Sequence, residues 1–430
     1  MSSISIHIKS TIRLPKASNI RTLSPVPVYD VINFSDARTE KLGELLAKGH
    51  DTVAPLRNPK LILHSHLPHQ WTLYLQIQQQ FLGSAYALGA DKDQLVRSYE
   101  HEITQLVPIG RGFIRGDAIF RDNWRDFLAQ KEYTVAYVDF FDGQVKGREG
   151  AWIKVLEEYL YSGAEPLING FTGGPYAYEF ASPQVATQAL SQGCTEYNPL
   201  HTLLDYPSVD NSTYKTTSLS EVIERVRKDS YFDSDLLEPG ILNLDILTQR
   251  QHLDVVRKHW NSWQVVDPIR QFEECCDLAV HIALINGDME RSFDFYNAHI
   301  LTVAHALRVL WTYLPPKHLA TVLKQYVLFV ILTYVSQLRP DFGIEVLEEV
   351  TLDGRGWDWV INTALDSKWA LDVHFFKVVR APKVFEETFG RKEDIYLKAA
   401  IKYVTEFRGW EGYGPGIEGF VPSRDGWMPE

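Results

Sequence analysis

Apolar side chains recur at helical spacing along most of the chain. From Pro68, a favourable first residue of a helix, they follow at intervals of three and four residues as far as Gly89, which predicts a helix over 68–88. Asp91 is placed to cap the helix that comes next. The same pattern predicts helices over 132–163 (divided near Gly147 and Gly150), 183–193, 264–287, 291–313, 317–338, 357–367, 369–387 and 392–407.

Three stretches lack this pattern. Residues 170–215 are rich in Gly, Pro, Ser and Asn, so we expect loops there, apart from the helix over 183–193. Ile4, Ile6 and Ile8 alternate with polar neighbours and predict an edge strand, whereas the Gly- and aromatic-rich tail predicts coil without a regular element. No linker divides the chain. We therefore predict a mainly α fold, in which 1–430 form a single large helical domain with one or two short N-terminal strands in an arm over 1–30 and a coil over 408–430.

Composition narrows the class of protein. The 430 residues carry a formal net charge of −12, which repels phosphate backbones and argues against nucleic-acid binding. The longest apolar run, 326–335 with one threonine inside it, is half the length of a membrane span and predicts a core helix. The N-terminus has no signal-peptide pattern, and the three cysteines lack zinc-ribbon or redox spacing. We expect a soluble protein of the reducing cytoplasm.

Familiar cofactor and hydrolase motifs are missing. Gly414, Gly416 and Gly419 match the GxGxxG spacing, but a proline lies inside the motif and no helical pattern follows it. The chain has no Walker A, HExxH or GxSxG sequence. We therefore expect no flavin, and no motif supports NADPH.

Histidines occur in three strongly apolar segments. These segments are LILHSHLPHQW with His64, His66 and His69, YNAHILTVAHALRVLW with His299 and His305, and ALDVHFFKVVRA with His374 and Lys377. His374 and Lys377 are three residues apart and share one helical face, so they can address one point. His299 and His305 lie about 120° apart around a helix, so both reach one ion only across a shared groove or through a π-bulge. His281 lies in a further apolar segment and is a lesser candidate.

These residue types suit a metal centre. Imidazole nitrogens bind iron, zinc, copper and nickel. The amine of Lys377 has its pKa lowered in an apolar pocket and, when neutral, can add carbon dioxide to form a carboxylate-like carbamate. Taken singly, a histidine on an apolar face is more often a core residue bonded to a carbonyl, and a lysine more often extends to the surface. Three apolar helices that each carry histidines favour a site, because buried polar groups are costly unless satisfied.

At these residues the sequence resembles the questin-oxidase-like family, helical oxygenases of fungal aromatic-polyketide pathways. The matching stretches lie at 64–91, 298–310 and 371–381, with looser matches in GFTGGPYAYEF and GWEGYGPGIEGF. The resemblance implies an oxidoreductase that incorporates O2 and opens the central ring of a hydroxylated anthraquinone, a small aromatic polyketide. It implies neither a nucleic-acid partner nor a membrane.

The anthraquinone-cleaving dioxygenases of this type use non-heme Fe(II) held by four histidines and a carboxylated lysine. Carried over by position, the resemblance implies that the metal ligands are His66, His299, His305, His374 and carboxylated Lys377. His374 and Lys377 are the residues to which it assigns catalysis. Arg308 and 412–420 are candidate substrate-binding elements.

One departure from the family pattern leaves the ligand set open. We expect a histidine just after a double glycine, but Gly173-Gly174-Pro175 continues into Tyr176. If that histidine is a ligand in the family, either His69 or His281 replaces it here or the site is built differently. Two other functions also remain open: an oxidase of the same family that is metal-free or uses NADPH, and a helical ligand-binding protein without catalysis.

Overall fold

The computed structural model describes residues 14–34, 36–57, 77–110, 119–162, 167, 174–197, 209–236, 238–240, 242–284, 292–341 and 345–414. Within these residues the protein is mainly helical, with two small two-stranded sheets. The predicted fold class is therefore confirmed.

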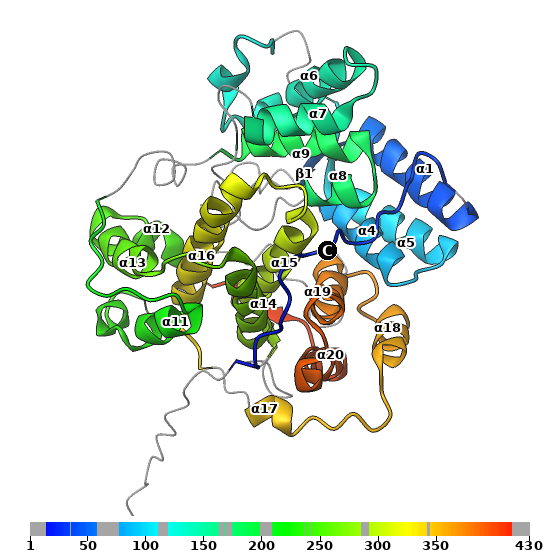
Figure 1. Cartoon of the computed structure of the whole chain (residues 1–430). Coiled ribbons are helices and arrows are strands. Elements are labelled where there is room, and N and C mark those ends of the chain that lie inside the picture. Colours follow the sequence, from blue (N-terminus) through cyan, green and yellow to red (C-terminus); the bar gives the residue numbers. More distant parts are fainter. Residues whose placement is uncertain are drawn as a thin grey trace, which may run out of the picture.

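The centre of the fold is α15 (Phe295–Leu310), in which every residue is buried. It packs against α14 (Pro268–Leu284), α16 (Leu319–Ser336), α19 (Val373–Phe389) and the short α8 (Pro175–Glu179) (Figure 1). A helix that is apolar on all sides must be enclosed on all sides, which explains why α15 takes this position.

The remaining helices form groups around this centre (Figure 1). One group is α1 (Ala37–Thr52), α4 (Ile77–Ala87) and α5 (Lys92–Ile103), and a second is α6 (Thr134–Lys146), α7 (Trp152–Glu157) and α9 (Pro183–Thr195). A third is α11 (Leu219–Lys228), α12 (Asn243–Leu247) and α13 (Arg250–Ser262), and a fourth is α17 (Glu345–Glu348), α18 (Trp357–Leu365) and α20 (Ile395–Glu406). Short 3₁₀ turns lie at Trp124–Phe127, Lys131–Tyr133, Ser230–Asp233, Pro316–His318 and Lys392–Asp394, and a π-helical turn lies at Glu158–Ser162.

Both sheets join segments that are distant in sequence. β1 (Val53–Arg57) pairs antiparallel with β2 (Leu106–Pro108). β3 (Phe293–Asp294) pairs in parallel with β4 (Trp410–Glu411), with Phe293 opposite Trp410. The second sheet therefore brings the C-terminal part of the described chain to the start of α15.

Most of the predicted helices are present, with ends shifted by a few residues. The break near Gly147 separates α6 from α7, and Asp91 begins α5 with a complete capping box. The expectation of one helix in 170–215 was wrong, because Pro175 also begins α8 as a first-turn proline. The prediction of a tail without regular structure was wrong at β4, where two residues pair with β3.

Two other predictions fall partly outside the described residues. Residues 14–34 form no strand, and the alternating isoleucines before them, like the helix start at Pro68, lie outside the described part of the chain. By length and composition, the helix Pro316–Ser336 is apolar enough to cross a membrane. Its apolar part is thus longer than the ten-residue run in the sequence suggested. However, 78% of its apolar window is buried inside the protein, as expected of a core helix.

A helical glycine on α4 tests how tightly this helix is packed, and a helical glycine on α6 is the control. A Cβ atom on Gly83 would lie 2.3 Å from the ring of Phe180, and that ring is buried and stacked on Tyr29 and Tyr176. Gly83→Ala should therefore lower the free energy of unfolding by about 1–3 kcal/mol, because the ring has little room to move. Gly143→Ala, in an exposed turn of α6 with no atom within 4 Å of the added Cβ, should raise it by roughly 0.5–1 kcal/mol. Urea unfolding of both variants measures this, and equal effects would contradict the packing described.

Candidate functional site

Two neighbouring helices bring His299 and His374 together. The ring centroids lie 4.9 Å apart with an interplanar angle of 55°, and both side chains are buried. The carboxylate of Asp372 fixes the start of α19, because it accepts hydrogen bonds from the backbone N–H groups of His374 at 2.8 Å and Phe375 at 2.9 Å. His374 is thereby held in the first turn of its helix.

The tautomer of His299 is set by its own helix. Its Nδ1–H donates to the carbonyl of Phe295 at 2.6 Å, so Nε2 carries the lone pair. This Nε2 is buried and has no hydrogen-bond partner among the described residues. Burial, and then the charge of Lys377, lowers the pKa of His299 to about 3. The ring is therefore neutral at physiological pH, with a free lone pair, which is the state a metal ligand requires.

Lys377 lies one turn beyond His374 on α19 and is 3% exposed. Its charge contributes to the lowered pKa of His299. The structure places His374 and Lys377 one turn apart on α19 and brings His299 of the neighbouring helix against His374. That Lys377 shares a site with them stays a prediction.

Aromatic rings enclose the histidine pair. The ring of Phe295 lies 4.6 Å from both His299 and His374. Tyr413 and Trp410 lie 5.0 Å and 5.7 Å from Phe295. The surroundings of the pair are thus apolar and aromatic, which weakens solvation and strengthens electrostatic interactions within the site.

A short C-terminal segment, 407–414, holds the first turns of both helices, and we call it the strap. The indole N–H of Trp410 donates to Asp372 at 2.8 Å. With the amide of Gln337 in the orientation that satisfies its neighbours, its nitrogen donates to Asp294 at 2.8 Å and to the carbonyl of Gly412 at 3.1 Å. Asp294 begins α15 as Asp372 begins α19. Each aspartate precedes a histidine-bearing helix, and this cap signature could have been found in the sequence. The contacts of the strap could not be found there, because they join residues that are distant in sequence.

His305 lies further along the same helix as His299. It is six residues beyond His299, a rise of about 9 Å along α15. Burial, and then the charges of Arg380 and Arg308, lowers the pKa of His305 far below its usual value. No three His, Cys, Asp or Glu side chains among the described residues gather closely enough to hold a metal ion. His66, with His64 and His69, lies outside the described residues, so the predicted five-ligand set stays a prediction.

A family model described as Questin oxidase-like matches residues 76–382. The chain belongs to the questin oxidase-like family. The matched span contains His299, His305, His374 and Lys377, and the strap lies beyond it. No curated protein matches the sequence. The family is named for an oxidase. Membership therefore supports an oxidoreductase that acts on a small molecule.

His281, the reserve ligand of this questin oxidase-like protein, is bonded within its own helix. Its Nδ1–H donates to the carbonyl of Asp277 at 2.7 Å on α14. Burial lowers its pKa to about 4, and Lys392 acts in the same direction. Its Nε2 atom, like that of His299, is buried and has no hydrogen-bond partner among the described residues, so its role as the reserve ligand stays a prediction.

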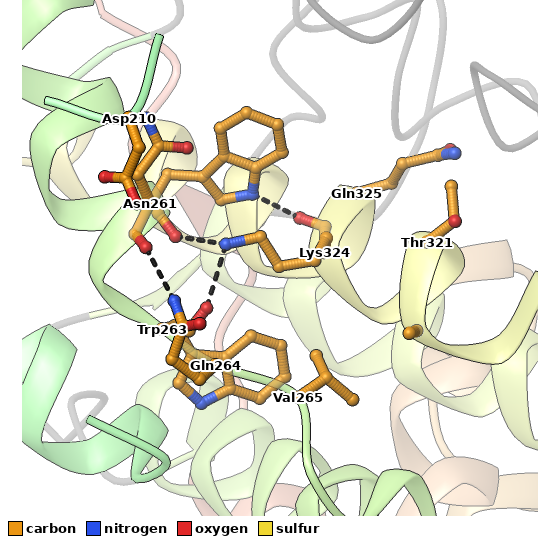
Figure 2. Close-up of a pocket in the computed structure, with 10 residues that line it drawn as sticks. Asp210, Asn261, Trp263, Gln264, Val265, Thr321, Lys324 and Gln325 are labelled. Carbon is orange, nitrogen blue, oxygen red and sulfur yellow. Dashed lines mark hydrogen bonds between the residues drawn. The ribbon is translucent and has the colours of Figure 1, made fainter. Parts of the chain in front are cut away.

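A second desolvated lysine provides a comparison for Lys377. Lys324 borders a cavity of about 470 Å³, and its amine donates to the carbonyls of Trp260 and Trp263 (Figure 2). The indole N–H of Trp260 donates in return to the carbonyl of Lys324 at 2.6 Å. Burial lowers the pKa of Lys324 to about 8. These bonds join the C-terminal end of α13 to α16, and none of the residues that line the cavity is a histidine.

The cap of α15 should make stability depend on pH. Burial raises the pKa of Asp294 to about 7, against the opposing effect of the N–H groups of Asn297 and Tyr296. The folded protein then binds more protons than the unfolded chain between about pH 4 and pH 7, so this residue makes stability fall as pH rises through that range. Asn caps helices as well as Asp does. Asp294→Asn should therefore gain stability over the wild type, on the order of a few kcal/mol, between pH 5 and pH 8.

Urea unfolding at the two pH values measures this difference. Asp36, the exposed N-cap of α1, is the matched control, because hydrogen bonds from Thr39 lower its pKa. Asp36→Asn should show no such gain at pH 8. Parallel pH profiles for Asp294→Asn and the wild type would contradict the assignment.

Proposed function

We propose that the protein is a non-heme-iron dioxygenase that opens the central ring of a hydroxylated anthraquinone in fungal aromatic-polyketide biosynthesis. The observation that carries this proposal is the buried pair of His299 and His374, with buried Lys377 one turn further along α19, inside the span matched by the questin oxidase-like family. Family membership supports the oxidase class, and the three side chains support metal chemistry within that class.

The residues present fit a ferrous ion. His299 offers a buried Nε2 lone pair, and imidazole is a good ligand for iron. Neutral imidazoles leave the charge of the ion uncompensated. Addition of carbon dioxide to the neutral amine of Lys377 forms an N–C bond, releases one proton and leaves a carbamate anion that would compensate it. His66 and His305 complete the proposed set, with His69 or His281 as the reserve ligand.

The protein's own part is to bind, orient and exclude water. Phe295, Trp410 and Tyr413 provide aromatic walls against which a flat, fused-ring substrate can stack. The bound metal supplies the activation of dioxygen. The strap fixes the position of His299 relative to His374, because it holds the first turns of the two helices that carry them.

A metal-free or NADPH-dependent Baeyer–Villiger-type oxidase is the second candidate. It is favoured by the lack of a cluster of three ligand side chains within the described part of the chain. The two proposals differ in one measurable quantity, the iron content of active protein. Full turnover by chelator-treated, rigorously metal-free protein would exclude the dioxygenase, whereas loss of turnover on chelation and recovery with ferrous iron supports it.

Lys377→Ala tests the proposed anionic ligand. The variant should lose at least tenfold in iron content and in oxygen consumption with a hydroxyanthraquinone, because the carbamate is removed. Millimolar acetate or propionate should restore part of both, because a free carboxylate can occupy the vacated position. Lys324→Ala removes a partly buried lysine that borders a cavity lined by no histidine, and the variant should keep its iron. Unchanged iron in Lys377→Ala would contradict the proposed ligand.

A further inference from the structure

A chain of hydrogen bonds links a tyrosine, a histidine and an aspartate outside the candidate site. The Tyr214 hydroxyl lies 2.9 Å from Nδ1 of His259, and Nε2 of His259 lies 2.9 Å from a carboxylate oxygen of Asp229. None of the three residues lies on α15 or α19, the helices that carry the histidine pair. The proposed function therefore makes no use of them.

Three segments bring these side chains together, in the group that contains α11 and α13 (Figure 1). His259 lies in the last turn of α13, and Asp229 directly follows α11. Tyr214 lies in the segment before α11, where Thr216 forms a β-bridge with Trp263 just beyond α13. The backbone thus places the tyrosine beside the histidine.

The direction of each hydrogen bond follows from the charges. Burial opposes ionisation of Asp229, but the hydrogen bonds it accepts, first of all from His259, hold the pKa of its carboxyl below the usual value. The ionised carboxylate accepts from Nε2–H, so Nδ1 carries the lone pair and accepts the proton of the Tyr214 hydroxyl. Burial lowers the pKa of His259 and raises the pKa of Tyr214, so a neutral base faces a protonated phenol.

All three residues line one cavity of about 510 Å³, a volume that admits a small organic molecule. The cavity is also lined by Arg225, Lys228 and Lys258, each ion-paired with a neighbouring carboxylate. The guanidinium carbon of Arg225 lies 4.2 Å from the centroid of the Tyr214 ring. Its charge stabilises negative charge that develops on the phenol.

A histidine that is held by a carboxylate and bonded to a hydroxyl is the arrangement by which proteins activate a weak nucleophile. The carboxylate fixes the tautomer and the orientation of the imidazole, and the imidazole takes up the proton as the oxygen attacks. Tyrosine is among the side chains that form covalent intermediates in this way. The reaction partner must bring an electrophilic carbon and a leaving group, and an activated ester supplies both.

We propose that Tyr214, His259 and Asp229 form a second chemical site, at which the phenol oxygen of Tyr214 accepts an acyl group from a small activated ester. The bond from the phenol oxygen to the acyl carbon forms as the bond from that carbon to the leaving oxygen breaks. The phenol proton passes to Nδ1 of His259 and then to the leaving oxygen, so no oxidant or reductant is consumed. Tyr214 is the nucleophile, His259 is the base, and Asp229 is a positioning residue that acts through His259. The inference does not depend on iron or on dioxygen.

The test treats the full-length protein with p-nitrophenyl acetate. The wild type should release roughly one equivalent of p-nitrophenolate per chain in an initial burst, because the tyrosyl ester accumulates. Peptide mass spectrometry should find the acetyl group on Tyr214 roughly tenfold or more ahead of Tyr231, the gain that a general base provides. Tyr231 is the internal reference. It is 38% exposed and Tyr214 is less exposed, so exposure alone predicts the opposite order.

Four variants assign the roles. Tyr214→Phe keeps the ring beside Arg225 and should lose the burst. His259→Gln keeps a donor for Asp229 and an acceptor for Tyr214 but has no basic nitrogen, so it should acetylate Tyr214 roughly a hundredfold more slowly. Asp229→Asn should slow the burst without lowering its amplitude, because the aspartate does not itself react. Tyr231→Phe is the matched control and should keep the wild-type burst.

The outcomes separate a chemical role from a structural one. Loss of the burst in His259→Gln at an unchanged melting temperature supports the site. If the hydrogen bonds only hold the segment before α11 against α13, His259→Gln reacts as the wild type does. An unchanged rate in His259→Gln or Asp229→Asn therefore overturns the proposal.

The wild-type protein provides a further test that needs no variant. No burst, or acetylation of Tyr214 that is no faster than that of Tyr231, overturns the site even if every variant fails to fold. A burst that persists in Tyr214→Phe does the same, because the acyl group then goes to another residue.

Discussion

The candidate site depends on two aspartate caps that one segment of chain holds together. Asp294 begins α15 and Asp372 begins α19, and both contact the strap, through Gln337 and Trp410 respectively. A capped first turn has little freedom, because its N–H groups have found acceptors. Since His299 and His374 follow these caps by five and two residues, the relative position of the two rings depends on how the caps are tied.

The same region combines neutral bases with buried positive charge. Burial keeps the imidazoles of His299 and His305 neutral, while Arg308 and Arg380 stay cationic because guanidinium is too basic to lose its proton. A core built for stability alone would have replaced these groups with apolar side chains of similar volume. These polar and charged groups are concentrated on α15 and α19. Their position indicates that this part of the core serves a function besides packing.

Local pattern was sufficient for much of the fold and for part of the site. Periodicity located the helices around Asp91 and Gly147 and the helices α14, α15, α16, α18, α19 and α20, because each buries one face or all faces and so leaves a spacing signal. The placement of His374 and Lys377 on one helix, one turn apart, followed from the same rule. The partnership of His299 with His374 could not be derived, because it depends on which helices pack together. β4 was missed for the same reason, since a two-residue strand exists only through its partner.

The parallel pairing of β3 with β4 also has a consequence for how the protein is made. α15 is enclosed by segments that precede and follow it, and its first turn is completed by residues more than a hundred positions later. A chain emerging from the ribosome therefore cannot close its centre until the strap has been synthesised. Contacts of such long sequence separation are slow to form, so the nascent protein carries its central helix incompletely enclosed until late in translation. Dependence on chaperones during synthesis follows from that delay.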